Sequence, residues 1–204
     1  RSGKTTLLYQ IIDFLIGEGV ETKSICYVQM DDERFALYDK KTLIKNIIDA
    51  YQEITGKSIQ KDKIFFIFDE IQYIENWESW LKTYYDRYEK IKFIVSGSSS
   101  TLIEKKSVEK LTGRQINIII YPLSFREFLQ FNGVEIKIKE NIFKFSVKEL
   151  ENNIELMSKK NEIKILLAKF LEAGGFPQTI FKNNDERKLL LRQYFRDIIY
   201  RDIV

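Results

Sequence analysis

The sequence has no histidine and a single cysteine, Cys26. Without histidine, the chain cannot build a Ser-His-Asp triad, a histidine general base or a histidine-ligated metal site. A lone cysteine excludes a cysteine-rich zinc site and an internal disulfide, which favours a reducing compartment. Any chemistry of this chain must therefore depend on carboxylates, lysine, arginine and hydroxyl groups.

Long apolar runs and blocks of one charge are also missing. No stretch of about 18 uncharged apolar residues occurs, and no signal peptide pattern is present. We therefore expect a cytoplasmic protein with no membrane partner. The net charge of +3 is spread along the 204 residues, so it permits contact with nucleic acid without arguing for it.

Helix and strand patterns alternate in the first 121 residues. Apolar residues at helical spacing predict helices over 5–16, 43–51, 77–88 and 101–111. Short runs rich in β-forming residues predict strands over 24–30, 64–68, 93–95 and 116–121. This alternation is typical of an α/β fold in which a parallel sheet carries helices on both faces.

Strand patterns largely stop after residue 122. We expect helices over 124–131, 147–157, 163–173 and 185–204, and either a hairpin or a mobile insertion over 134–145. The sequence therefore predicts an α/β core over residues 1–122 and a helical lid over residues 123–204. The last helix would begin the linker to a C-terminal domain.

The first five residues, Arg-Ser-Gly-Lys-Thr, match the end of the phosphate-loop pattern G-x-x-x-x-G-K-[ST]. In this pattern Gly3 lets backbone N–H groups close around phosphate oxygens, Lys4 reaches the β- and γ-phosphates, and Thr5 offers its hydroxyl to Mg²⁺. The flanking Ser2 and Thr6 complete the predicted phosphate-binding set. The first glycine of the pattern and the strand before it would precede residue 1. The alternative is an ordinary helix N-terminus with a glycine turn and a threonine cap.

A second motif follows the predicted buried strand 64–68, where Asp69 and Glu70 come directly after five apolar residues. A strand buried on both faces delivers its last residues to the edge of the sheet where open α/β folds bind ligands. Asp69 would hold Mg²⁺ through water, and Glu70 would orient the attacking water. The alternative is a strand end with two solvated acids.

Polar residues also follow the next predicted strand. Ser96 and Ser98 lie in the serine-rich turn 96–100, where a hydroxyl could sense the γ-phosphate or hold the water; a turn and helix cap is the alternative. Arg114 follows the predicted helix 101–111. In an oligomer it could neutralise charge on a neighbour's γ-phosphate, although a charge favoured by the helix dipole explains it equally well.

Several of these motifs resemble one family, the archaeal and bacterial AAA+-like P-loop ATPases. The run Phe68-Asp69-Glu70-Ile71-Gln72, followed by Trp77-Glu78 and Leu81-Lys82, is similar to the family's F-L-D-E-I-Q…W-x-x-x-L-K stretch. Further matches occur in order at 95–100, 111–114, 121–128, 174–177 and 194–198.

The resemblance implies five core strands with the phosphate-loop strand in the middle. It also assigns Lys4 and Thr5 to phosphate and magnesium, Asp69 and Glu70 to metal and water, and Arg114 to an arginine finger. The Phe176-Pro177 turn is similar to a lid turn that packs near the nucleotide base. A C-terminal domain normally follows this core and lid.

Aromatic residues make up 14% of the sequence, which raises stacking on nucleic-acid bases as an alternative role. However, Trp77, Trp80, Tyr84 and Tyr88 follow helical spacing, which more often indicates a core or an interhelical contact.

These patterns together predict an Mg²⁺-dependent ATPase whose lid and downstream domain convert nucleotide state into movement. The alternatives are a regulatory switch or scaffold with negligible hydrolysis, or a DNA-associated ATPase module. This interpretation is compatible with a homo-oligomer that forms through Arg114. It is also compatible with a DNA or protein partner that binds the C-terminal domain. Residues 1–204 alone should bind ATP poorly, because half of the loop and the central strand precede them.

Overall fold

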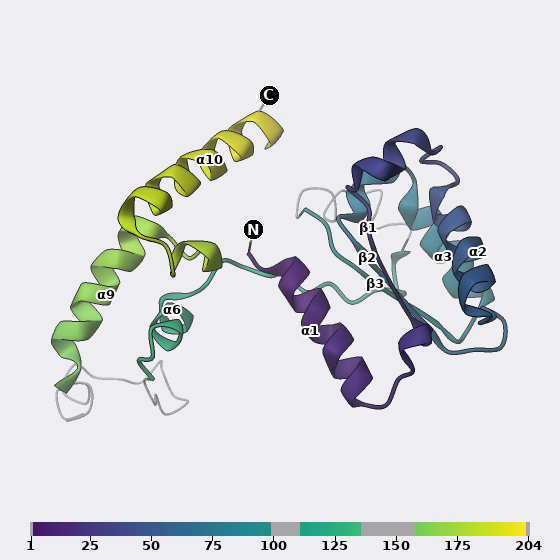
Figure 1. The fold of residues 1–204 in the computed structure, drawn as a ribbon, viewed down its shortest axis with the longest axis horizontal. Helices are drawn as coiled ribbons and strands as arrows, with labels where there is room; N and C mark the ends of the chain where they lie inside the picture. The colour runs from purple at the N-terminus through teal and green to yellow at the C-terminus, as the bar shows by residue number, and fades with distance from the viewer. Residues whose placement is uncertain (1, 99–110, 136–157, 203–204) are drawn as a thin grey trace. The chain divides into compact units, whose positions relative to one another are not determined.

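A three-stranded parallel sheet organises the first part of the chain (Figure 1). The structure is a computed structural model that describes residues 2–98, 111–135 and 158–202. The strands are β1 (Ile25–Gln29), β2 (Ile64–Asp69) and β3 (Ile91–Val95), in the spatial order β1-β2-β3. Their parallel register places Tyr27 opposite Ile67 and Gln29 opposite Asp69.

Helices cover the two faces of this sheet. Helix α1 (Lys4–Gly17) lies on one side, and helices α2 (Leu43–Thr55) and α3 (Trp77–Arg87) lie on the other (Figure 1). Short 3₁₀ turns connect these elements, at Thr22–Ser24, Glu33–Leu37 and Ile71–Tyr73. The predicted parallel sheet with helices on both faces is therefore confirmed, and the predicted strands and helices up to residue 95 are present.

The central strand β2 is buried because apolar side chains leave it on both faces. Phe66 and Phe68 are fully buried and pack against Phe93 of β3, with ring centroids 5.7 and 6.1 Å away. They belong to a core that α2 and α3 complete with Ile44, Ile48, Trp77 and Leu81. Since side chains alternate along a strand, Ile67 and Asp69 face the opposite side, where α1 lies.

The expected strand over 116–121 is wrong. Residues 115–121 are irregular, and Ile116, Ile118, Ile119 and Tyr121 are exposed. A strand needs a neighbour for its backbone hydrogen bonds. No described strand pairs with residues 115–121. A run rich in β-forming apolar residues therefore cannot by itself make residues 116–121 a strand.

The chain divides into two compact units, Lys4–Ile119 and Ile120–Val204, the latter together with the first three residues. The second unit contains α6 (Phe125–Phe131), α9 (Lys160–Ala173) and α10 (Asn184–Asp202), with a 3₁₀ turn at Pro177–Thr179. Phe128, Leu129, Val134 and Leu166 form its small core. The helices predicted over 124–131, 163–173 and 185–204 are present, the last within the described residues up to 202.

Two local contacts define the second unit. Ser124 and Glu127 form a reciprocal capping box at the start of α6, which satisfies backbone donors that the first turn leaves free. Gly175 accepts a hydrogen bond from the N–H of Leu123 at 2.6 Å, and a Cβ at this position would lie 2.2 Å from the Leu123 carbonyl oxygen. Only glycine therefore fits this close approach.

The helix expected over 147–157 and most of the helix expected over 101–111 lie outside the described residues. The hairpin or insertion expected over 134–145 is described only to residue 135. None of the helices in the described parts of the chain has the length and apolar character needed to cross a membrane.

Candidate nucleotide site

Asp69, the last residue of β2, is the centre of the candidate site. It is only 1% exposed, because β1 and β3 flank the strand end on both sides. The N–H of Met30 donates to the Asp69 carbonyl oxygen at 2.9 Å, and the N–H of Ser96 donates to the Phe68 carbonyl oxygen at 2.9 Å. These backbone hydrogen bonds fix the end of β2, from which the Asp69 side chain projects.

Thr5, in the first turn of α1, donates its hydroxyl to Asp69 Oδ2 at 2.7 Å. The two residues lie 64 positions apart in the sequence, and α1 brings them together because it packs on the sheet face to which Asp69 points. The phosphate-loop motif and the acidic motif therefore meet at one edge of the sheet.

Four donors surround the Asp69 carboxylate. Oδ2 accepts from the hydroxyls of Thr5 at 2.7 Å and Tyr27 at 3.3 Å. Oδ1 accepts from the hydroxyl of Ser96 and from the backbone N–H of Glu70, the latter at 3.1 Å. Buried polar groups cost little when they are hydrogen-bonded, so these four hydrogen bonds hold the buried carboxylate in a fixed orientation.

Glu70 leaves the strand in a left-handed conformation, with φ 54° and ψ 47°. Its N–H donates both to Asp69 Oδ1 and to Ser96 Oγ, each at 3.1 Å. A non-glycine residue in this region carries a cost and draws attention to a site where surrounding contacts enforce it. Here the Asp69 and Ser96 side chains enforce the turn that directs the Glu70 side chain away from the strand.

Gln72 belongs to the same cluster, although the sequence reasoning did not select it. Its side-chain amide Nε2 donates to Glu70 Oε2, while its carbonyl oxygen Oε1 is buried and has no hydrogen-bond partner among the described residues. Gln72 is the last residue of the Phe68–Gln72 motif, so the sequence could have indicated it. The spacing of the motif alone assigns no chemical role to its side chain.

Tyr27 is the second residue that sequence reasoning missed. Its hydroxyl lies between Asp69 Oδ2 and the Tyr9 hydroxyl oxygen, which is 3.4 Å away. The rings of Tyr9 and Tyr27 also pack together, with centroids 5.3 Å apart. Burial raises the pKa of Tyr27, with Tyr9 and the Asp69 charge acting in the same direction, so this phenol remains a protonated donor.

The predicted phosphate-binding residues lie at the start of α1. Gly3 has φ 100°, a conformation that favours glycine, and α1 begins immediately afterwards at Lys4. Ser2, Lys4 and Thr5 are half-buried, and Thr6 is exposed. An anion would meet free backbone N–H groups at this helix N-terminus.

The remaining predicted residues are Ser98, Arg114, Phe176 and Pro177, each described by its own surroundings. Ser98 is half-buried in the segment after β3. Arg114 donates from Nε to Asp86 Oδ1 of α3 at 2.7 Å, so it forms an ion pair within its own chain. Phe176 and Pro177 belong to the second unit, where the Phe176 ring packs edge-on against Tyr194 with centroids 5.1 Å apart. The structure brings together Thr5, Asp69, Glu70 and Ser96.

The residues around Asp69 fit a magnesium ion. Thr5 and Asp69 supply hard oxygen donors 2.7 Å apart, which are the ligands that Mg²⁺ prefers. No group of three or more Asp, Glu or Cys side chains suited to a metal occurs among the described residues. Magnesium does not need such a group, because it is usually held by one or two protein oxygens, waters and substrate phosphates.

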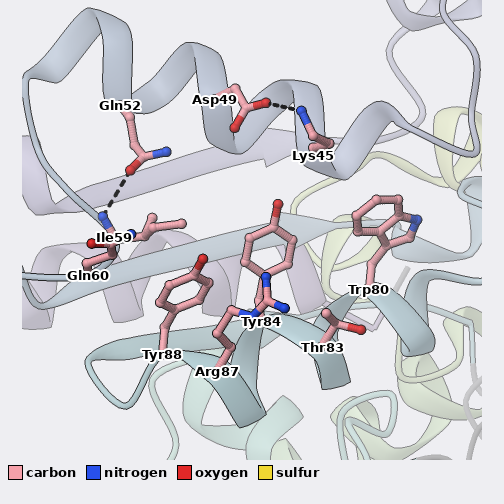
Figure 2. A pocket seen from close by; sticks show the side chains of 10 residues that line it. All are labelled: Lys45, Asp49, Gln52, Ile59, Gln60, Trp80, Thr83, Tyr84, Arg87 and Tyr88. Carbon is pink, nitrogen blue, oxygen red and sulfur yellow. Dashed lines mark hydrogen bonds and ion pairs between the residues drawn. The ribbon is translucent and has the colours of Figure 1, made fainter.

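A separate cleft of about 480 Å³ lies between α2 and α3 (Figure 2). Trp80, Tyr84 and Tyr88 stack on one another along its α3 side, and Lys45 is paired with Asp49 at 2.5 Å on its α2 side. Trp80 also donates its indole N–H to the Lys41 carbonyl oxygen at 2.8 Å. The aromatic residues at helical spacing thus make an interhelical contact, and no residue of the Asp69 cluster lines the cleft.

Comparisons with known proteins add a family to this geometry. A family model described as AAA domain matches residues 1–129. The match includes the phosphate-loop residues, β1 to β3, the Asp69 cluster and the first part of α6. No solved structure matches the chain.

The chain is also similar to three curated proteins. It is 33% identical over 207 residues to the uncharacterized protein MJ1544 of Methanocaldococcus jannaschii, covering 100% of this chain and 40% of that protein. It is 34% identical to MJ1637 of the same organism, covering 98% and 41%. An uncharacterized protein of Haemophilus influenzae is 27% identical, covering 100% and 44%. The chain therefore spans about two-fifths of the length of these relatives.

Proposed function

The chain belongs to the AAA domain family, and from this premise we propose that it binds ATP with Mg²⁺ and hydrolyses the γ-phosphate. The observation that carries the proposal is the 2.7 Å hydrogen bond from Thr5 to Asp69. It joins the two residues that an ATPase of this kind uses to hold the metal. A helix cap and a solvated strand end, the alternatives for these motifs, would have no reason to meet.

Each residue of the cluster has a role in this proposal. The N–H groups at the start of α1 and the Lys4 ammonium bind the phosphates. Thr5 and Asp69 hold the magnesium ion, which when bound neutralises charge on the phosphates. Glu70 orients the attacking water, and Ser96 fixes both the Asp69 carboxylate and the backbone of Glu70.

The second unit would serve as the lid of this ATPase. In the proposal, residues 123–204 respond to the nucleotide state and transmit it to a C-terminal domain, and the Phe176-Pro177 turn packs near the nucleotide base. Arg114 would act on the γ-phosphate bound by a neighbouring copy. The chain spans about two-fifths of the length of its relatives. The partner that receives the signal must therefore be sought with the whole protein.

Glu70→Gln in the full-length protein tests the hydrolysis step. The substitution removes a charge but keeps the side-chain shape, so ATP affinity measured by calorimetry should stay within about twofold, and turnover should fall by at least about 100-fold. Glu75→Gln is the matched control, because Glu75 is exposed and lies outside the cluster. We expect it to leave turnover unchanged.

The wild-type measurement separates the alternatives. Magnesium-dependent ATP binding without measurable turnover would indicate a regulatory switch or scaffold. Unchanged turnover in Glu70→Gln would refute the role of Glu70. A salt-dependent mobility shift with DNA would be required for a DNA-associated module.

A further inference from the structure

The Asp69 carboxylate has no acceptor site left for a metal-bound water. An ionised carboxylate offers about four lone-pair sites on its two oxygens. All of them are used here: Thr5 and Tyr27 donate to Oδ2, and Ser96 and the Glu70 N–H donate to Oδ1. A magnesium ion that binds through Asp69, directly or through water, must therefore displace one of these donors.

Three of the four donors are poorly placed to leave. The Glu70 N–H belongs to the backbone, and its turn is held by this contact and by Ser96. Ser96 is 5% exposed, so its hydroxyl would lose a charge-assisted bond with no water to replace it. Thr5 makes a well-formed bond at 2.7 Å that can persist while its oxygen lone pair binds the metal.

Tyr27 differs in two respects. Its hydrogen bond to Asp69 is the longest of the four, at 3.3 Å, and a hydrogen bond weakens as it lengthens. Its hydroxyl also has a second acceptor, the Tyr9 hydroxyl oxygen at 3.4 Å. Since a phenol has one proton, Tyr27 can donate to Asp69 or to Tyr9, but not to both.

We propose that the Tyr27 hydroxyl holds the place of a metal-bound water on Asp69 Oδ2 and turns its proton to Tyr9 when Mg²⁺ arrives. Tyr27 is a positioning residue in this scheme, because it acts through Asp69. Tyr9 lies one helical turn after Thr5 on the same face of α1, so one helix carries both the metal ligand and the alternative acceptor. The inference rests on the proposed function and adds a control on metal affinity.

Two tyrosine substitutions should change the metal dependence of nucleotide binding in opposite directions. Tyr27→Phe removes the competing donor, and Tyr9→Phe removes the alternative acceptor and so retains Tyr27 on Asp69. The measurement is the affinity of the full-length protein for a fluorescent, non-hydrolysable ATP analogue in excess Mg²⁺ and in EDTA. The dissociation constant in EDTA divided by the dissociation constant in Mg²⁺ gives the factor by which the metal strengthens nucleotide binding.

We expect Tyr27→Phe to increase this ratio about fivefold and Tyr9→Phe to lower it about two- to threefold, the size of one ordinary hydrogen bond. Affinity in EDTA should not change. Tyr85→Phe is the matched control, because Tyr85 belongs to α3, is 42% exposed and contacts Lys92 of β3, whose Nζ lies 5.9 Å from the ring centroid. It should leave the ratio unchanged.

The outcomes distinguish this inference from the function on which it rests. A ratio that stays constant or falls in Tyr27→Phe overturns the inference, while wild-type binding that depends on Mg²⁺ leaves the proposed function standing. Wild-type protein that binds no nucleotide in either condition overturns both. If Tyr27→Phe loses cooperative unfolding, Tyr9→Phe decides alone, because its ring is half exposed and an unchanged ratio there overturns the inference.

Discussion

Replacing Ser96 tests whether hydrogen bonds hold the Asp69 carboxylate in place or whether Asp69 is only an acidic residue at a strand end. Its hydroxyl donates to Asp69 Oδ1 and accepts the N–H of Glu70 at 3.1 Å. In Ser96→Ala the Glu70 N–H still has Asp69 Oδ1, also at 3.1 Å, so one bond is lost outright. That bond is charge-assisted and buried, since Ser96 is 5% and Asp69 is 1% exposed.

The expected cost follows from this count. Losing one hydrogen bond to a charged group costs about 1.5–3 kcal/mol, so the unfolding transition of this part of the protein should move to a lower temperature. The assay is thermal unfolding of the full-length protein without nucleotide, together with the metal-dependent affinity ratio. Ser79→Ala is the control, because Ser79 lies on α3, outside the Asp69 cluster, and is only half-buried. Its effect should remain below about 0.5 kcal/mol.

A double substitution tests the physical cause. In an Asp69→Asn background the charge that strengthens the bond is gone, so Ser96→Ala should cost clearly less than it does in wild-type protein. An equal cost in both backgrounds would show that the loss comes from packing, and a cost no greater than that of Ser79→Ala would refute the hydrogen-bond argument.

Two further predictions concern residues outside the cluster. Burial raises the pKa of Cys26 to about 11, so its thiol should resist alkylation at neutral pH and react faster as the pH rises towards that value. Mass spectrometry of the Cys26 peptide measures the labelling rate, with guanidinium-unfolded protein as the control. Rapid labelling of the native protein at neutral pH would contradict the prediction. Arg114 pairs with Asp86, so if it serves a neighbouring active site, Arg114→Ala should lower turnover about 10³-fold while Asp86→Ala should not. Mixing Arg114→Ala with Glu70→Gln should then restore part of the activity, and no recovery on mixing would refute action between copies.

Most of the fold could be predicted because it depends on local periodicity. The apolar stripe of α1 and the short buried strands predicted a parallel sheet. The carboxyl ends of parallel strands lie at one edge of the sheet. The meeting of Thr5 with Asp69 followed from that topology. The strand expected over 116–121 failed for the opposite reason: strand formation requires a partner, and its own apolar residues do not supply one.

The tyrosines and Gln72 could not be found in this way. The contact of Tyr27 with Asp69 depends on the exact register of β1 against β2, which places Tyr27 opposite Ile67 and two residues before the partner of Asp69. No local pattern encodes that register. Gln72 reaches Glu70 only because Glu70 adopts a left-handed turn, a conformation that the sequence of a glutamate does not suggest.

The site depends on which face of the sheet carries the Asp69 side chain. The run Ile64–Phe68 is apolar at every position, so it carries no alternation that could reveal the faces. The structure turns Phe66 and Phe68 towards α2 and α3, and the two-residue period then turns Ile67 and Asp69 towards α1. A shift of one residue would send Asp69 into the aromatic core and Phe68 towards Thr5. The burial of Phe66 and Phe68 against α2 and α3 is therefore linked to function, because the same strand orientation brings the Asp69 carboxylate to α1.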